Sequence, residues 1–163
     1  MNTISHLSIH IMFSLLSGLL VFRLWKKPVI SFAAAIVSGV LVDLDHFIDY
    51  FLAFGTNFRL DYFMHGYQFL KSDKVYILFH TWEYVIILLA ISFILKNKWG
   101  RSLVLGLALG LFFHLWADVF INNVPVSIYS IIKRSKNNFE IQKLAYPGHW
   151  EEHKRQKEIT KFD

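Results

Sequence analysis

Four long apolar runs constrain the fold of this chain more than any other feature. They cover residues 7–25, 29–53, 75–95 and 102–121. Each approaches the ~20 residues that a helix needs to cross the hydrocarbon core of a bilayer. Of the 163 residues, 55% are hydrophobic and only 18% are charged. This hydrophobic fraction excludes a disordered chain and is higher than that of an ordinary soluble domain. The sequence therefore predicts an all-α fold, an integral membrane bundle of four transmembrane helices.

The segments between the runs predict how the bundle is organised. Basic turns follow the first and third runs, and the proline Pro28 separates the first run from the second. The aromatic-rich residues 54–74 are typical of a loop in the membrane interface. We therefore expect a four-helix transmembrane domain over residues 1–125 and an amphipathic, charged C-terminal tail over residues 126–163. Because basic residues follow the first run and none precedes it, we expect a retained helix rather than a cleaved signal peptide.

The charge of the chain indicates its partners. The net charge is +5, but the basic residues lie between and after the apolar runs, where lipid headgroups are the expected contact. We therefore expect membrane lipids as partners and no nucleic acid. The chain has no cysteine, which excludes disulfides and thiolate metal ligands. The short basic turns favour a cytoplasmic position for their side of the bundle, whereas the long tail favours the opposite orientation.

Ionisable residues inside the apolar runs are the most informative for function, because a buried aspartate costs ~2.5–3.5 kcal/mol in the centre of a membrane helix. Neighbours within each run are three or four positions apart, so each pair shares a helix face. The residues in or beside the runs are His6, His10, Asp43, Asp45, His46, Asp49, His80, Glu83, His114 and Asp118.

These residues also share one depth. Four antiparallel spans place the start of the first and third runs on the same membrane side as the end of the second and fourth. At 1.5 Å per residue, one histidine from each run then lies about 5–10 Å inside that edge. They are His10, His46, His80 and His114. Pairing between helices does not need so many histidines and carboxylates at one end, so we predict a site that handles a metal ion or protons.

Histidine and carboxylate ligands without cysteine suit zinc, manganese or iron, with zinc as the first choice and manganese as the alternative. The predicted ligands are His10, Asp43, Asp45, His46, His80, His114 and Asp118, and His6 is an alternative to His10. Their number exceeds the three or four protein ligands of one catalytic zinc ion. One or two ions are therefore expected, with the surplus residues serving a second ion, a second ligand shell or a general base.

Two motifs, Asp43-Leu44-Asp45-His46 and Phe113-His114-Leu115-Trp116-Ala117-Asp118, resemble those of the prokaryotic integral-membrane metal-dependent hydrolase family. The resemblance runs from the first apolar run to about residue 125. It implies that the family's remaining histidines are His6 or His10 and His80. It also implies an enzyme of the plasma (inner) membrane of a prokaryote. The chain departs from a histidine-rich motif of that family, because Val75 occupies the place of an earlier histidine.

Three functions remain open from the sequence. The first is a metal-dependent hydrolase at the membrane interface, acting on a lipid or lipid-linked phosphoester, in which Asp49 or Glu83 takes the proton of an activated water. The second is a metal-ion or proton transporter, although transport sites usually lie nearer the midplane. The third is a non-enzymatic scaffold with a structural polar core. The oligomeric state is left open.

A second sequence motif of the kind that binds metal lies in the tail. The stretch His149-Trp150-Glu151-Glu152-His153 has the His-x-x-Glu-His spacing of inverted zinc peptidases. Five residues match such a pattern easily by chance, and few residues follow that could supply a third ligand. We therefore expect a solvated tail here rather than a catalytic site.

Overall fold

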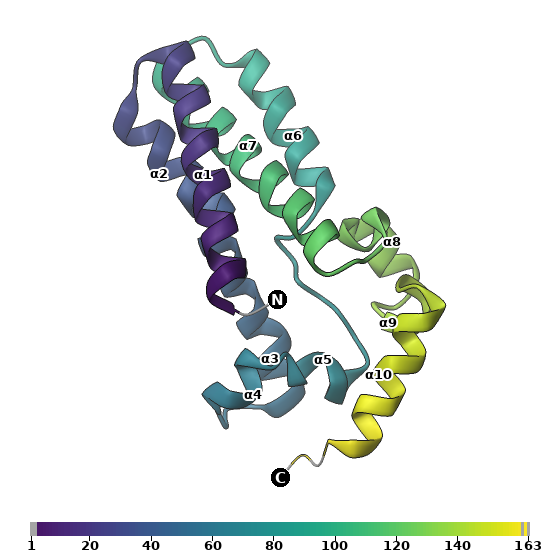
Figure 1. Cartoon of the computed structure of the whole chain (residues 1–163). Coiled ribbons are helices and arrows are strands. Elements are labelled where there is room, and N and C mark those ends of the chain that lie inside the picture. The colour runs from purple at the N-terminus through teal and green to yellow at the C-terminus, as the bar shows by residue number, and fades with distance from the viewer. Residues whose placement is uncertain (1–2, 161, 163) are drawn as a thin grey trace. The chain divides into compact units, whose positions relative to one another are not determined.

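A computed structural model describes residues 3–160 and residue 162 of the chain. It is 78% helical, which confirms the predicted all-α class, and no strand occurs among the described residues. The helices, labelled in Figure 1 where there is room, are α1 Thr3–Trp25, α2 Pro28–Gly39, η1 Leu41–Asp45, α3 His46–Phe54, α4 Leu60–Met64, α5 Tyr67–Ser72, α6 Trp82–Ile94, α7 Lys98–Ile121, η2 Val126–Tyr129, α8 Ile131–Lys136, α9 Ile141–Leu144 and α10 Pro147–Ile159.

The chain divides into two compact units. The first unit contains the chain up to Asp43 together with Phe79–Asn123, and the second contains Leu44–Leu78 and the chain from Val124 onward. The segment that we expected to belong to the transmembrane domain between residues 44 and 78 thus packs with the C-terminal residues. The aromatic stretch expected as a loop contains the short helices α4 and α5.

Two helices are long and apolar enough to cross a membrane: Ser5–Trp25 within α1, with 21 residues, and α7, with 24 residues. The second apolar run is broken at Val40 into two helical pieces, α2 and the segment Leu41–Phe54. These two pieces form a bent pair, which is a third candidate span only if both pieces together make one crossing. The third run yields the 13-residue helix α6, which is about 20 Å long at 1.5 Å per residue. By length and composition the chain therefore has two or three candidate spans, which is consistent with a membrane location.

In the first unit, α1, α2 and α6 pack around α7 (Figure 1). Small residues allow α2 and α7 to approach closely. A Cβ atom at Gly106 would lie 2.8 Å from the Cβ of Ala34, and one at Gly110 would lie 2.5 Å from the carbonyl oxygen of Ala35. Close contact at small residues is the usual way in which helices associate in lipid. The bundle is thus held by backbone proximity that larger side chains would prevent.

Buried serines in this bundle satisfy their hydroxyl groups within their own helices. The hydroxyls of Ser14 and Ser17 donate to the carbonyls four residues earlier at 2.8 Å, as does that of Ser31 at 2.7 Å. Such internal bonds let a polar residue lie inside an apolar bundle without an unpaired donor.

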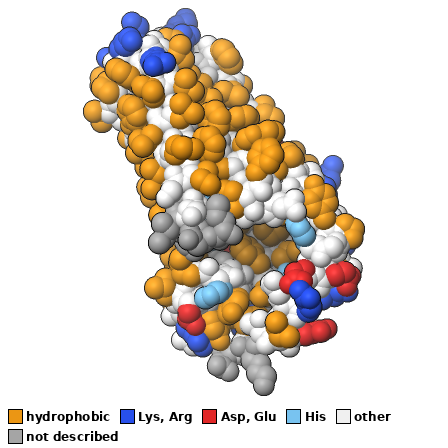
Figure 2. Space-filling model, in the orientation of Figure 1, with side chains coloured by type: hydrophobic (Ala, Val, Ile, Leu, Met, Phe, Trp, Pro, Cys, Tyr) orange, Lys and Arg blue, Asp and Glu red, His pale blue; other side chains and the backbone are white. Residues whose placement is uncertain are grey.

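The outer face of the first unit is apolar along its length and basic at one end (Figure 2). Val29 is 80% exposed and Phe93 is 81% exposed, an arrangement that suits lipid rather than water. At the basic end, the Lys27 ammonium lies 4.4 Å from the centre of the Trp99 ring and the Arg101 guanidinium lies 5.1 Å from the Trp25 ring. Such pairs of aromatic and basic residues are typical of the headgroup region.

The second unit is organised around an aromatic cluster. The ring of Phe47 stacks on that of Phe63 at 4.4 Å, and Tyr50, which is fully buried, packs edge-on against Phe58 at 5.2 Å. The hydroxyl of Tyr50 donates to the Asn57 carbonyl at 3.1 Å and accepts the backbone N–H of residue 59 at 2.8 Å. This one side chain therefore ties the middle of α3 to the residues just before α4.

A buried arginine fixes the rest of this unit. Arg134 is 0% exposed, and its guanidinium donates to the carbonyl oxygens of Ile128 at 2.8 Å and Ile77 at 3.1 Å. Nearby, Asp73 pairs with His153 at 2.9 Å and with Lys157 at 2.5 Å. Burial raises the pKa of the Asp73 carboxyl, but hydrogen bonds from Lys157 and His153 outweigh burial and hold the pKa below its ordinary value. These contacts join α10 to the end of α5.

Candidate metal centre

Six side chains of the first unit converge where α1 begins and α7 ends. His6 and His10 come from α1, Asp43 comes from η1, and His80 precedes α6 by two residues. The remaining two, His114 and Asp118, lie one turn apart on α7. Four of the six are buried, with His10, His80, His114 and Asp118 at most 4% exposed. The side chains of His6 and Asp43 are 31% and 38% exposed, so the cluster is accessible on their side.

Asp118 lies at the centre of the cluster. Its Oδ1 atom is 3.2 Å from Nε2 of His6 and 3.2 Å from Nε2 of His10. Its Oδ2 atom is 3.2 Å from Nε2 of His114 and 3.9 Å from Nε2 of His80. One carboxylate therefore meets four imidazoles, two at each oxygen.

Asp43 is the second carboxylate of the cluster. Its Oδ1 atom lies 3.1 Å from Nε2 of His80 and 3.4 Å from Nε2 of His114. The two histidines also face each other, with 2.9 Å between their Nε2 atoms. Only one proton can lie between two ring nitrogens, so at least one of these nitrogens presents a lone pair to the cluster.

A backbone carbonyl determines which ring nitrogen of His114 carries the proton. Nδ1 of His114 lies 3.1 Å from the carbonyl oxygen of Gly39, the last residue of α2, and a carbonyl only accepts. A hydrogen bond to this carbonyl requires the proton on Nδ1, and in that tautomer the lone pair of Nε2 faces the cluster. A histidine held by its Nδ1–H so that Nε2 faces a ligand site is the usual arrangement of a metal-binding imidazole.

Subsets of the cluster have the compactness of a metal site. The ligand atoms lie within 4.8 Å of one another in each of three sets drawn from this unit, namely His6, His10 and Asp118; His10, Asp43 and His114; and His80, His114 and Asp118. Negative carboxylates together with neutral imidazole lone pairs attract a cation. These buried groups could hold a metal ion.

The sequence-predicted residues fall into two sets. The structure brings together His10, Asp43, His80, His114 and Asp118 in the first unit, and it adds His6, so that both histidines of α1 meet Asp118. The structure places the other predicted residues elsewhere. Asp45 and His46 belong to the second unit, where Oδ1 of Asp45 lies 3.1 Å from Nδ1 of His46.

The two residues expected to act on a proton differ in their surroundings. Both carboxylate oxygens of Asp49 accept backbone N–H groups, from residue 76 at 2.7 Å and from Ile77 at 2.9 Å. This carboxylate thus holds an extended segment of the second unit in place. Glu83 lies in the first turn of α6, three residues after His80, and accepts a hydrogen bond from the hydroxyl of Thr81.

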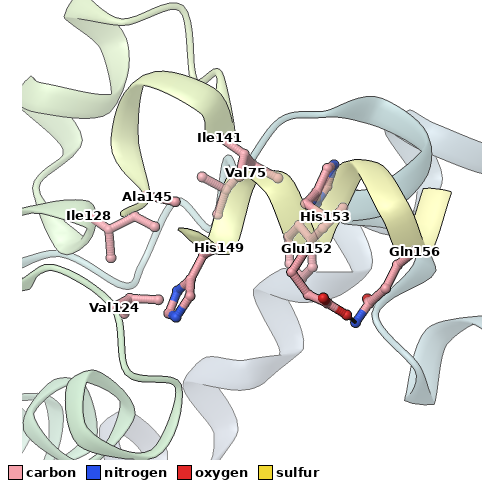
Figure 3. A pocket seen from close by; sticks show the side chains of 10 residues that line it. Val75, Val124, Ile128, Ile141, Ala145, His149, Glu152, His153 and Gln156 are labelled. Atoms are coloured by element: carbon pink, nitrogen blue, oxygen red, sulfur yellow. Dashed lines mark hydrogen bonds between the residues drawn. The ribbon is translucent and has the colours of Figure 1, made fainter. Parts of the chain in front are cut away.

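The tail motif lies on α10 beside a cavity of about 270 Å³ in the second unit (Figure 3). His149, Glu152 and His153 line the cavity together with apolar residues such as Val75 and Ile141. In Figure 3 the imidazole of His149 and that of His153 point in different directions from the helix. No compact set of metal ligands includes these residues in the part of the chain that the structure describes.

One functional group escaped the sequence reasoning. The Gly39 carbonyl orients His114, and no side-chain pattern encodes a backbone acceptor. The available indication was Gly39, which lies inside the second apolar run, because glycine is common where a helix ends and a helix end leaves carbonyls without helical partners.

No family model, no curated protein and no solved structure matches this chain.

Proposed function

We propose that this chain is a membrane-bound metal-dependent hydrolase that works near the membrane interface. The observation that carries the proposal is the convergence of four imidazoles and two carboxylates at one end of α1 and α7, with His114 oriented by the Gly39 carbonyl. A polar core that only joins helices has no need for six ionisable side chains gathered at one place. The proposal also agrees with the sequence resemblance to membrane metal-dependent hydrolases.

Zinc is the metal that we propose first, and manganese second, because the donors are imidazole nitrogens and carboxylate oxygens without sulfur. Bound at these donors, a divalent ion supplies Lewis-acid polarisation of a substrate oxygen and lowers the pKa of water. His80 and His114 hold it through Nε2, and Asp118 and Asp43 balance its charge. The Gly39 carbonyl keeps the His114 ring in the ligating orientation.

Glu83 is the proton acceptor that we propose. It belongs to the same unit as the cluster, follows His80 by three residues and is only partly buried. Its contact with the Thr81 hydroxyl fixes the carboxylate beside the segment that carries His80. Asp49 is the weaker candidate, because each of its oxygens already accepts a backbone N–H.

The position of the cluster along the helices suggests the substrate class. His10 lies near the start of the candidate span Ser5–Trp25, and Asp118 lies near the end of the span Lys98–Ile121. At 1.5 Å per residue both are about 5–10 Å from the ends of these helices, the depth of the boundary between headgroups and hydrocarbon. A substrate with its scissile bond at this depth is a lipid or lipid-linked phosphoester.

We also propose that α6 and the bent pair of α2 with Leu41–Phe54 lie in the membrane beside α1 and α7, in the inner membrane of a prokaryote. The basic turns then lie on the cytoplasmic side. Because the chain has no cysteine, single variants Lys27→Cys and Lys98→Cys report their side directly. Both cysteines should resist an impermeant maleimide in intact spheroplasts and react after lysis. Labelling in intact spheroplasts would refute this orientation.

The test of the function begins with protein purified in detergent without a histidine tag. Bound metal is measured by mass spectrometry, and turnover is measured on a panel of phosphoester and carboxylester lipids. We expect at least one equivalent of zinc or manganese, with turnover that a chelator abolishes and the metal restores. Glu83→Gln should keep the metal and lose turnover, whereas His149→Ala in the tail should change neither. Metal flux in proteoliposomes without hydrolysis would replace the proposal with a transporter.

A further inference from the structure

The two oxygens of Asp118 face two different pairs of histidines. Oδ1 lies 3.2 Å from Nε2 of both His6 and His10, which are one turn apart on α1. Oδ2 lies 3.2 Å from Nε2 of His114 and 3.9 Å from Nε2 of His80. Two of the compact ligand sets in this unit are His6, His10 and Asp118, and His80, His114 and Asp118. Asp118 is the one residue that these two sets share. This is the arrangement of a carboxylate that bridges two centres.

The number of donors also exceeds the requirement of one ion. A catalytic zinc takes three protein ligands and leaves a fourth position for water or substrate. His80, His114 and one oxygen of Asp118 supply three donors on one side, with Asp43 beside them. His6, His10 and the other oxygen of Asp118 supply a second set of three. Two ions with a shared carboxylate use all six side chains, whereas one ion leaves two or three imidazoles in the cluster without a role.

His10 is the most deeply buried donor on the α1 side of the cluster. The His10 side chain is 0% exposed, and neither ring nitrogen has a hydrogen-bond partner among the described residues, although Nε2 is 3.2 Å from Asp118. A cation between Nε2 of His10 and the Asp118 carboxylate would bind both groups. His10 also stacks on His114, with 4.1 Å between ring centres, so the two halves of the cluster are in contact.

We propose, on the basis of the proposed function, that the cluster is a dinuclear centre in which Asp118 bridges two divalent ions. His6 and His10 hold one ion and His80 and His114 hold the other, with Asp43 on the side of the second. Pairs of ions of this kind clamp the attacking and leaving oxygens in displacement at phosphorus. A dinuclear centre therefore favours a phosphoester over a carboxylester as the substrate.

The first test uses the unaltered protein and needs no activity. The metal-free protein is titrated with Mn²⁺ in detergent, and electron paramagnetic resonance spectra are recorded at one and two equivalents. Two bridged ions give an exchange-coupled signal at two equivalents, and the six-line signal of isolated Mn²⁺ falls. Mass spectrometry of zinc-loaded protein should give two equivalents. One tightly bound equivalent with an uncoupled Mn²⁺ signal would overturn the dinuclear centre and leave a single-ion hydrolase standing, whereas no binding at all would overturn both.

Variants assign the two ions to the two halves. His6→Ala removes a partly exposed ligand and should weaken one of the two equivalents by at least about tenfold, since even changes outside the first ligand shell cost 10–100-fold. His6→Ala with His10→Gln should leave one equivalent and abolish the coupled signal. His149→Ala is the matched control, because this tail histidine belongs to the other unit. Loss of an equivalent in the control, or two coupled ions in His6→Ala with His10→Gln, would overturn the assignment.

Discussion

The substitution Gly110→Ala tests the link between helix packing and the metal cluster. Gly110 lies on α7 one turn before His114, against α2. A Cβ atom there would lie 2.5 Å from the carbonyl oxygen and 3.0 Å from the Cα of Ala35, and it would also meet the Ser38 hydroxyl. Ordinary contact begins at 3.4 Å, so the α2 backbone would have to retreat by about 0.9 Å from the added methyl group.

The expected magnitude follows from two opposing effects. Alanine is the better helix former by about 0.8–1.0 kcal/mol, which favours the variant. Overpacking against a neighbouring backbone costs typically 1–3 kcal/mol and more where no side chain can move aside. We expect a net destabilisation of about 1–2 kcal/mol. At roughly 2–4 °C for each kcal/mol in a chain of this size, the melting temperature should fall by about 2–8 °C.

The retreat of α2 should also reach the metal cluster. Gly39 lies at the end of α2, and its carbonyl is 3.1 Å from Nδ1 of His114, near the long end of the range for such hydrogen bonds. A shift of several tenths of an ångström breaks this bond and releases the ring of His114. The metal affinity of Gly110→Ala should therefore fall about 10–100-fold, as it does when a residue that orients a ligand is lost.

The measurement pairs thermal unfolding in detergent with a metal titration. Gly148→Ala is the matched control, because a Cβ atom at Gly148 on α10 would meet nothing within 4 Å. The control should leave the melting temperature unchanged or slightly raised and should bind metal normally. A Gly110→Ala protein that behaves like the control would refute both the close packing of α7 on α2 and its connection to His114.

Three further substitutions test contacts outside the cluster. Arg134→Lys keeps the charge but cannot donate to two carbonyls at once, so the second unit should lose about 1–3 kcal/mol and become sensitive to trypsin. Asp73→Asn keeps a residue that tolerates its φ of 56° and removes the pairing with Lys157, at a cost of up to about 0.5–1 kcal/mol because the side chain is 40% exposed. Since the pKa of Asp73 is lowered, this contribution is full above pH ~5 and vanishes as the pH falls through that lowered pKa, so the melting temperatures of wild type and variant should converge in acid. Asn97→Ala removes the side chain that caps α7 at 2.6 Å and should lower stability by about 1 kcal/mol in thermal unfolding.

The sequence predicts α7 well because the apolar run, the capping residue and the spacing of the ionisable residues all indicate one helix. Its apolar run is continuous, Asn97 caps its start, and the four-residue spacing of His114 and Asp118 needs only helical geometry. The two side chains do share a face, with 3.2 Å between Nε2 and Oδ2. A local period is thus sufficient for a site built along one uninterrupted helix.

The third apolar run shows where such a pattern is insufficient. Hydropathy alone favours a helix over residues 75–95, but the helix begins only at Trp82. Asp49 accepts the N–H groups of residues 76 and 77, and the N–H of Val75 donates to the carbonyl of Phe139 at 3.0 Å. Partners from distant parts of the chain occupy the amides that a longer helix would have used. No window of neighbouring residues contains that information.

The Asp43-Leu44-Asp45-His46 stretch is predicted correctly in part: it does supply a residue to the cluster, but its local structure differs from the expected helix. The prediction assumed one α-helix across this stretch, in which Asp43, Asp45 and His46 span an arc of about 160° at 100° per residue. The structure instead ends α2 at Gly39, has the 3₁₀ helix η1 at Leu41–Asp45 and starts α3 at His46, so the side-chain directions do not follow a single helical period. Of the three, Asp43 meets histidines of the first-unit cluster, with Oδ1 3.1 Å from Nε2 of His80, whereas Asp45 pairs with His46. Asp43→Asn should therefore weaken metal binding more than Asp45→Asn, and the opposite order in a metal titration would show that Asp45 is the more important ligand.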